Sequence, residues 1–149
     1  MQKCYLALGC FWKPEETFRN IKGIVDTEVG YAGGKSNKVT YEEICTGNTG
    51  HAETVKLTFD ESLISFEKIL EYFFNIHDPT QKDMQYPDVG TQYRSEIFYE
   101  NDKQKKIAEK YKNIFYEKIN RKIETNISEL KNYCKAEDYH QKYIMKRSN

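Results

Sequence analysis

The residue with the clearest chemical potential in this sequence is Cys10, which stands between a short apolar stretch and the start of a helix. Residues 5–8 predict a buried strand that ends at Gly9, and Pro14, followed by two glutamates, is typical of a first helical turn. Free backbone N–H groups at a helix start stabilise a thiolate and lower the pKa of a cysteine. We therefore expect a nucleophile at Cys10, against the usual alternative of an inert buried thiol.

Two large aromatic side chains follow this cysteine directly. Phe11 and Trp12 could both belong to the core, but at a helix entry they could also wall an apolar cage beside the sulfur. The chain contains 12 Tyr, 8 Phe and 1 Trp, so many ring hydroxyls need polar partners. Some of these rings are therefore expected to line a site.

Polar residues elsewhere in the chain are less specific on their own. Glu53 stands where a glycine-containing turn enters residues 54–59, which alternate apolar and polar side chains with period two. A glutamate in that position is ordinarily solvated. Asp88 and Tyr93 lie in a polar loop before a predicted strand, where binding groups gather, and Tyr41 alone is an ordinary amphipathic tyrosine.

The elements that must position these residues alternate along the chain. Apolar patterning predicts strands at residues 5–8, 24–31, 54–59, 95–99 and 123–127, a helix from Pro14, and helices over residues 66–74 and 107–118. This order predicts an α+β fold, a two-layer sandwich with a split βαβ (ferredoxin-like) core and an irregular C-terminal segment. Without any repeat or linker, we expect a single catalytic domain over residues 1–149.

Composition argues against several classes of protein. Lys plus Arg is 23 and Asp plus Glu is 23, so the formal net charge is zero, which argues against a nucleic-acid partner held by a broad cationic face. The longest apolar runs fall short of the roughly 20 residues of a membrane span, and residues 1–12 lack the basic start of a signal peptide. We expect a cytoplasmic protein with reduced thiols and no membrane partner.

Cysteine and histidine spacing gives no metal pattern. The four cysteines are Cys4, Cys10, Cys45 and Cys134, and no two of them form a C-x-x-C pair. His51 and Glu53 do not form the H-E-x-x-H pattern of zinc enzymes. The sequence therefore predicts neither a bound metal nor another cofactor.

Six short motifs along the chain carry a more specific signal. They are Gly-Cys-Phe-Trp at residues 9–12, Glu-Val-Gly-Tyr-Ala-Gly-Gly at 28–34, Gly-His-Ala-Glu at 50–53, His-Asp-Pro-Thr at 77–80, Asp-Val-Gly-Thr-Gln-Tyr-Arg-Ser at 88–95 and Ala-Glu-Asp-Tyr-His-Gln at 136–141. In this order they resemble the peptide methionine sulfoxide reductase A family, over roughly residues 5–143. One tetrapeptide is weak evidence, whereas six in the family's order are strong.

The resemblance implies an enzyme that reduces the S epimer of methionine sulfoxide, free or in proteins. Cys10 matches the family's nucleophile and Glu53 its general acid. Tyr41 and Tyr93 match the two hydroxyls that hold the sulfoxide oxygen, and Asp88 matches a carboxylate of the binding pocket.

The chemistry implied by this resemblance agrees with the residue types. A thiolate attacks a sulfoxide sulfur readily only if the oxygen is protonated as it becomes a leaving group. Phe11 and Trp12, which match the pocket for the substrate's methyl group, would raise the pKa of Glu53 and keep it protonated near neutral pH. Cys10 would remain as a sulfenic acid that a thiol must reduce.

The sequence differs from this family in the residues that would return the oxidised nucleophile to a thiol. Many members of the family carry recycling cysteines in a glycine-rich tail, whereas the nine residues after His140 contain neither Gly nor Cys. We expect an external thiol, such as glutaredoxin, thioredoxin or a small thiol, to reduce Cys10 directly. Cys134, in an expected loop, is the candidate internal resolving cysteine. Cys4 is about 20 Å away along an extended strand, and Cys45 is expected to be packed.

Two other functions use some of the same features. In a cysteine-based peroxidase the activated thiolate would attack a peroxide, but a carboxylic acid and a methyl cage would have no clear use there. An RNA-binding plait would carry aromatic side chains on its sheet together with a basic surface. The zero net charge argues against this second alternative.

Overall fold

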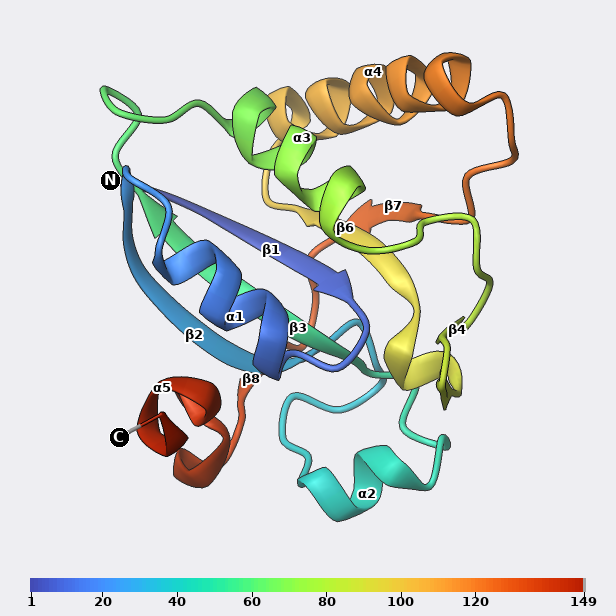
Figure 1. Ribbon diagram of the computed structural model, residues 1–149. Coiled ribbons are helices and arrows are strands. Elements are labelled where there is room, and N and C mark those ends of the chain that lie inside the picture. The colour runs from blue at the N-terminus through green and yellow to red at the C-terminus, as the bar shows by residue number, and fades with distance from the viewer. Residues whose placement is uncertain (149) are drawn as a thin grey trace.

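The computed structural model describes residues 1–148, within which a six-stranded sheet forms the centre of the molecule (Figure 1). The strands are β1 (Gln2–Leu8), β2 (Ile24–Ala32), β3 (Ala52–Phe59), β6 (Ser95–Tyr99), β7 (Asn126–Glu129) and β8 (Cys134–Lys135). They lie in the order β7-β6-β1-β3-β2-β8. Neighbouring strands are antiparallel except β6 and β7, which are parallel.

Two interleaved crossovers confirm the split βαβ core. The helix α1 (Trp12–Arg19) connects β1 to β2 with β3 between them, and α3 (Phe66–Ile76) connects β3 to β6 with β1 between them. The helix α4 (Asp102–Ile119) then joins β6 to its parallel neighbour β7, a connection that requires a crossover. It packs on α3, where the rings of Phe74 and Phe115 stack with centroids 5.3 Å apart.

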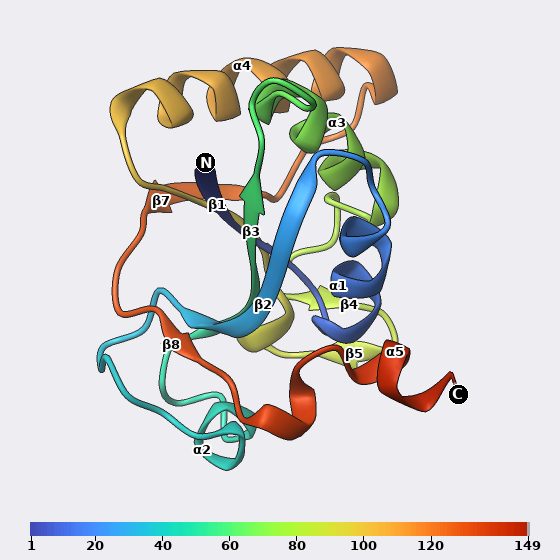
Figure 2. The same cartoon turned by 90° about the vertical axis from the view of Figure 1, so that its left-hand side faces the viewer.

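The two faces of the sheet are covered differently. Figure 2 shows α1 and α3 on one side of β2 and β3, and the larger apolar core lies between these layers. On the other face, Tyr133 packs edge-on against Tyr5, with ring centroids 5.1 Å apart. A Cβ atom on Gly30 would lie 2.6 Å from the Tyr133 ring, so this glycine lets the segment before β8 lie flat on the sheet.

Short elements gather at the end of the sheet where β1 stops, below α3 and α4 in both views (Figures 1 and 2). They are α2 (Tyr41–Cys45), β4 (Met84–Gln85), β5 (Asp88–Val89), the 3₁₀ turns η1 (Thr91–Tyr93) and η2 (Asp138–His140), and α5 (Tyr143–Arg147). Of the helices within residues 1–148, none combines the length and apolar character that crossing a bilayer requires.

Several predicted element bounds differ from the structure, and the starts of α1 and β7 are two of them. α1 starts at Trp12, ahead of Pro14, because the hydrogen bond from Glu15 N to Phe11 O (3.1 Å) already closes its first turn. β7 starts at Asn126, later than predicted, because its parallel pairing with β6 begins there. The first helical N–H groups are therefore closer to Cys10 than the sequence suggested.

Two of the four cysteines are not where the sequence predicted. Cys134, expected in a loop, lies on the edge strand β8 opposite Tyr31 of β2, and its Sγ contacts the Val39 carbonyl oxygen at 3.7 Å. Cys45, expected to be packed, is exposed, because α2 buries Ile44 and turns its last residue outward.

Candidate active site

The turn between β1 and α1 presents Cys10 at the end of the sheet. Gly9 has a φ of 95°, a conformation that residues with a side chain rarely adopt, and a Cβ atom there would lie 2.9 Å from Gln85 Cγ. Glycine therefore allows the β4–β5 hairpin to approach the cysteine turn. Gln85 in turn is held by Asp78, whose backbone N–H donates to its Oε1 at 3.0 Å.

The Cys10 thiol is half-buried and protonated in the resting protein. Burial raises its pKa to about 11, the charges of Glu53 and Asp88 act in the same direction, and a hydrogen bond from the Trp12 N–H opposes them. The prediction that the helix start would lower this pKa is therefore wrong for the free protein, because desolvation outweighs the single N–H group.

Glu53 is the buried carboxyl group of the site, with 2 % of its surface exposed. It projects from β3 opposite Tyr31, and its Oε1 accepts a hydrogen bond from the Phe11 backbone N–H at 3.2 Å. Burial raises the pKa of Glu53 to about 8; the Phe11 N–H opposes this shift and the charge of Asp88 adds to it. At neutral pH this carboxyl group therefore holds a proton next to the cysteine turn.

Two tyrosine hydroxyls lie near these groups. Burial raises the pKa of Tyr93, at the end of η1, to about 12, and the charges of Glu53, Asp88 and Cys10 add to this shift. The pKa of Tyr41, the first residue of α2, is also raised, first by a hydrogen bond with Cys45 and then by burial. Both hydroxyls therefore remain protonated and can donate hydrogen bonds to an oxygen atom.

An aromatic wall stands beside the cysteine turn. Phe11 is 1 % exposed, and its ring centroid lies 5.2 Å from that of His140. The half-buried Trp12 donates from its indole Nε1 to His140 Nδ1 at 3.0 Å and stacks on Tyr143 with centroids 3.7 Å apart and planes 5° apart. Arg147 lies over the same Tyr143 ring, at 3.6 Å from its centroid.

His140 is held neutral inside this wall. It is 1 % exposed, and burial lowers its pKa. Because its Nδ1 accepts from Trp12, the ring proton is on Nε2, a buried donor without a partner among residues 1–148. The Tyr41 ring packs against it with centroids 4.7 Å apart, so His140 connects α2 to the tryptophan.

Two carboxylates hold the C-terminal segment against the sheet. Glu137 accepts from the Tyr31 hydroxyl and from the Tyr41 backbone N–H, each at 2.8 Å, and so fixes the start of α2 beside β2. Glu15, 1 % exposed, accepts from the Thr27 hydroxyl at 2.7 Å and from the Lys142 N–H at 2.8 Å. These bonds keep the residues around Lys142 close to the start of α1.

The structure thus gathers the residues that the sequence singled out, with one exception. Cys10, Glu53, Tyr41, Tyr93, Asp88, Phe11 and Trp12 surround the end of β1, whereas Cys134 is paired into β8. Sequence reasoning missed the roles of His140, Tyr143, Glu137 and Tyr31. The motif at residues 136–141 was the available signal, but Trp12 and His140 are 128 positions apart, and only the fold shows that they touch.

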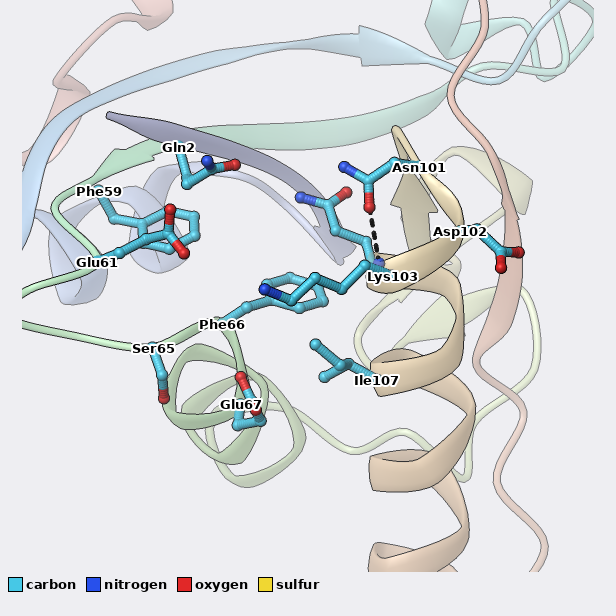
Figure 3. Close-up of a pocket in the computed structure, with 11 residues that line it drawn as sticks. Gln2, Phe59, Glu61, Ser65, Phe66, Glu67, Asn101, Asp102, Lys103 and Ile107 are labelled. Carbon is cyan, nitrogen blue, oxygen red and sulfur yellow. Dashed lines mark hydrogen bonds between the residues drawn. The ribbon is translucent and has the colours of Figure 1, made fainter.

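A cavity away from Cys10 lacks this chemistry. Its volume is about 490 Å³, and it opens between the starts of α3 and α4 (Figure 3). The helix starts beside it are already capped, by Ser65 on Lys68 N and by Asn101 on Gln104 N, so these backbone donors have partners. Within residues 1–148, no cluster of three His, Cys, Asp or Glu side chains is arranged to hold a metal ion.

The arrangement at Cys10 matches the transfer of an oxygen atom from a substrate to a thiol. Glu53 can give a proton to that oxygen, and the hydroxyls of Tyr41 and Tyr93 can hold it. The Trp12 N–H can stabilise the thiolate as it forms on Cys10.

Comparison with known proteins agrees with this geometry. The model of the family "Peptide methionine sulfoxide reductase" matches residues 2–149. The peptide methionine sulfoxide reductase MsrA of Pelagibacter ubique is 56% identical over 151 residues, covering 99% of this chain and 100% of the relative. The crystal structure of reduced Mxr1 from Saccharomyces cerevisiae has 38% identity and a TM-score of 0.95, covering 99% of this chain and 86% of that one. The crystal structure of Mxr1 in complex with Trx2 has 29% identity to this chain and a TM-score of 0.68. The match covers 95% of this chain and 84% of that one.

Proposed function

The chain belongs to the peptide methionine sulfoxide reductase family and reduces methionine sulfoxide to methionine, and from this premise we propose that Cys10 is the nucleophile and Glu53 the acid. The observation that carries the proposal is the buried Glu53, bound to the Phe11 N–H one residue from Cys10 and protonated at neutral pH. A carboxyl group kept neutral next to a thiol suits a reaction that protonates an oxygen while sulfur attacks.

In the proposed reaction the sulfoxide oxygen accepts hydrogen bonds from the Tyr41 and Tyr93 hydroxyls, and Glu53 donates its proton to it. Cys10 Sγ attacks the substrate sulfur, and the sulfur–oxygen bond of the substrate breaks. In the net step the thiol and the sulfoxide become a Cys10 sulfenic acid and methionine, so one oxygen atom moves from the substrate sulfur to Cys10 Sγ. Cys10 is oxidised and methionine sulfoxide is reduced.

Glu53 and Cys10 influence each other through their charges. The ionised form of Glu53 raises the pKa of Cys10, so the thiolate forms more easily while Glu53 keeps its proton. The Trp12 N–H then favours the thiolate without opposition from that carboxylate. This coupling supports a reactive form in which Cys10 has lost its proton and Glu53 has kept its own.

Phe11 and Trp12 would receive the methyl group of the substrate, and Asp88 would line the same pocket. Burying one methyl group is worth about 0.8 kcal/mol, so the hydroxyls rather than this wall would supply most of the orientation. The S epimer is the one that we expect to place its oxygen at the tyrosines and its methyl group at the wall. Because Cys10 and Trp12 are half-buried rather than enclosed, we expect the residue to be accepted free or within a protein.

An external thiol would return Cys10 to its reduced form. The complex of the yeast relative Mxr1 with Trx2 supports a thioredoxin-type reductant, and glutaredoxin is the alternative of similar chemistry. A reducing compartment such as the cytoplasm supplies these thiols, and we place the protein there, without a nucleic-acid or membrane partner. Cys134 stays a candidate internal resolving cysteine.

A coupled assay with separate S and R sulfoxides and several thiol donors tests this proposal. We expect turnover of the S epimer, none with Cys10→Ser, and a preference for a dithiol protein over small thiols. Equal turnover of both epimers, or turnover by Cys10→Ser, would contradict it. Faster reaction with peroxide than with sulfoxide would instead indicate a peroxidase.

A further inference from the structure

Arg94 follows Tyr93 directly and places its guanidinium group against the backbone of two segments beside the site. Its Nη1 donates to the Thr91 carbonyl oxygen and its Nη2 to the Gly50 carbonyl oxygen, each at 3.0 Å. Thr91 is the first residue of η1, whereas Gly50 stands three residues before Glu53. One side chain therefore joins the turn that carries Tyr93 to the segment that leads into β3 and Glu53.

A carboxylate holds the guanidinium group in this orientation. Arg94 Nε donates to Glu96 Oε1 at 2.6 Å, and both side chains are largely buried. The second oxygen of Glu96, Oε2, accepts a hydrogen bond from the Ser128 hydroxyl of β7. Because Glu96 is itself fixed to the sheet, the guanidinium group has one orientation in which Nη1 and Nη2 reach the two carbonyl oxygens.

The loop between β2 and β3 makes room for this group. Gly33 follows β2, and a Cβ atom on it would lie 2.9 Å from Arg94 Nη2. The base of the same loop is closed by a hydrogen bond from Lys35 N to Thr49 O at 3.2 Å. The neighbouring Gly50 carbonyl oxygen is therefore held close to the end of the sheet, where it can act as an anchor for the guanidinium group.

Glu53 and Tyr93 are anchored in different ways. Glu53 is paired with Tyr31 inside the sheet, so strand pairing holds it without help from Arg94. Tyr93 ends η1, and its backbone N–H donates to the Gly90 carbonyl oxygen at 3.0 Å, a bond that stays within the turn. The guanidinium group of Arg94 adds a hydrogen bond from this turn to the segment before β3.

We propose that Arg94 is a positioning residue, which fixes η1 against the entry to β3 and so holds the Tyr93 hydroxyl where Glu53 would protonate the sulfoxide oxygen. The inference rests on the proposed function, since that function assigns the oxygen to this hydroxyl. Arg94 acts through Tyr93 rather than on the substrate. A lysine in its place keeps the charge, but its single nitrogen cannot occupy the positions of three guanidinium nitrogens at once.

A double-mutant cycle between Arg94→Lys and Tyr93→Phe tests the proposal on the complete chain. The measured quantity is the rate at which the reduced protein forms methionine from saturating methionine S-sulfoxide in a single turnover. In the wild-type background, we expect Arg94→Lys to lower this rate on the order of tenfold, because the hydroxyl is misplaced. In the Tyr93→Phe background it should lower the rate by less than about twofold, because no hydroxyl is left to position.

Urea unfolding of the same proteins separates positioning from folding. The bonds of Arg94 to Glu96 and Gly50 do not involve the Tyr93 hydroxyl, so Arg94→Lys should lower the free energy of unfolding equally in both backgrounds. A purely structural role would instead give the same fold-loss of rate in both backgrounds. That result, or a wild-type rate for Arg94→Lys alone, would overturn the inference.

Arg19→Lys is the matched control. Arg19 also donates to a carboxylate, that of Glu16, but it lies at the end of α1. This variant should form methionine at the wild-type rate, and a loss as large as that of Arg94→Lys would overturn the inference. Absence of methionine from wild type, or a wild-type rate for Tyr93→Phe, would refute the proposed function and its assignment of Tyr93, and the inference would fall with them.

Discussion

The raised pKa of Glu53 should make the free energy of unfolding depend measurably on pH. In the folded protein burial raises the pKa of this carboxyl group to about 8, against 4.5 when it is solvated. Below pH 4.5 the carboxyl group is protonated in the folded and in the unfolded chain. Its contribution to the free energy of unfolding is then at its maximum. As pH rises toward 8 the unfolded chain ionises while the folded chain does not, so this contribution is progressively lost.

The size of the effect follows from these two values. Each pH unit between them costs about 1.36 kcal/mol, so the full loss is about 5 kcal/mol. About 2.3 kcal/mol of it falls between pH 6 and pH 8, since the folded carboxyl group is itself half ionised at pH 8. Above pH 8 the folded protein ionises as well and the loss levels off. Glu53→Gln keeps an acceptor for the Phe11 N–H and cannot ionise, so it should not show this decline.

Urea unfolding of wild type and Glu53→Gln at intervals from pH 6 to pH 9 measures the difference. Other groups act equally on both proteins: burial lowers the pKa of His77 to about 4, for example, and its contribution cancels in the comparison. Glu117→Gln, on the exposed side of α4, should follow wild type and serves as the matched control. Parallel stability profiles of wild type and Glu53→Gln would refute the assignment of a buried proton to Glu53.

Three further substitutions test the positioning of the site. Tyr93→Phe removes one of the hydroxyls proposed to hold the oxygen and should lower kcat/KM on the order of 10- to 100-fold, measured as methionine formed. Gly9→Ala forces a strained φ and a contact with Gln85, and should lower the free energy of unfolding by about 1–2 kcal/mol together with kcat. Glu137→Ala leaves the Tyr31 hydroxyl without its acceptor and should lower the free energy of unfolding, measured in urea, by about 1–3 kcal/mol. Wild-type behaviour of any of these three variants would contradict the role assigned to that residue.

Much of the fold could be predicted from local sequence. The period-two alternation of β3 and the apolar spacing of α3 follow directly from which side chains face the core. α2 gave no such signal, because a helix of five residues with one buried side chain, Ile44, is too short to show a period. The exposure of Cys45 was therefore predicted wrongly.

The residues of the site could be predicted from the sequence, but the direction of the pKa shift of Cys10 could not. Proximity to a helix start suggested a lowered pKa for Cys10, and that effect exists as the Trp12 N–H. The larger, opposite effect is burial, together with the charges of Glu53 and Asp88, which come from distant parts of the chain. Spacing along the sequence does not reveal how much water such segments exclude.

The roles of Cys10 and Glu53 are tested most directly by a single turnover of the reduced protein with methionine S-sulfoxide or R-sulfoxide, at neutral pH and without reductant. We expect up to one equivalent of methionine from the S epimer, oxidation confined at first to Cys10, and a rate lowered on the order of 100-fold or more in Glu53→Gln. Methionine formed at the wild-type rate by Glu53→Gln, or formed without oxidation of Cys10, would contradict these roles.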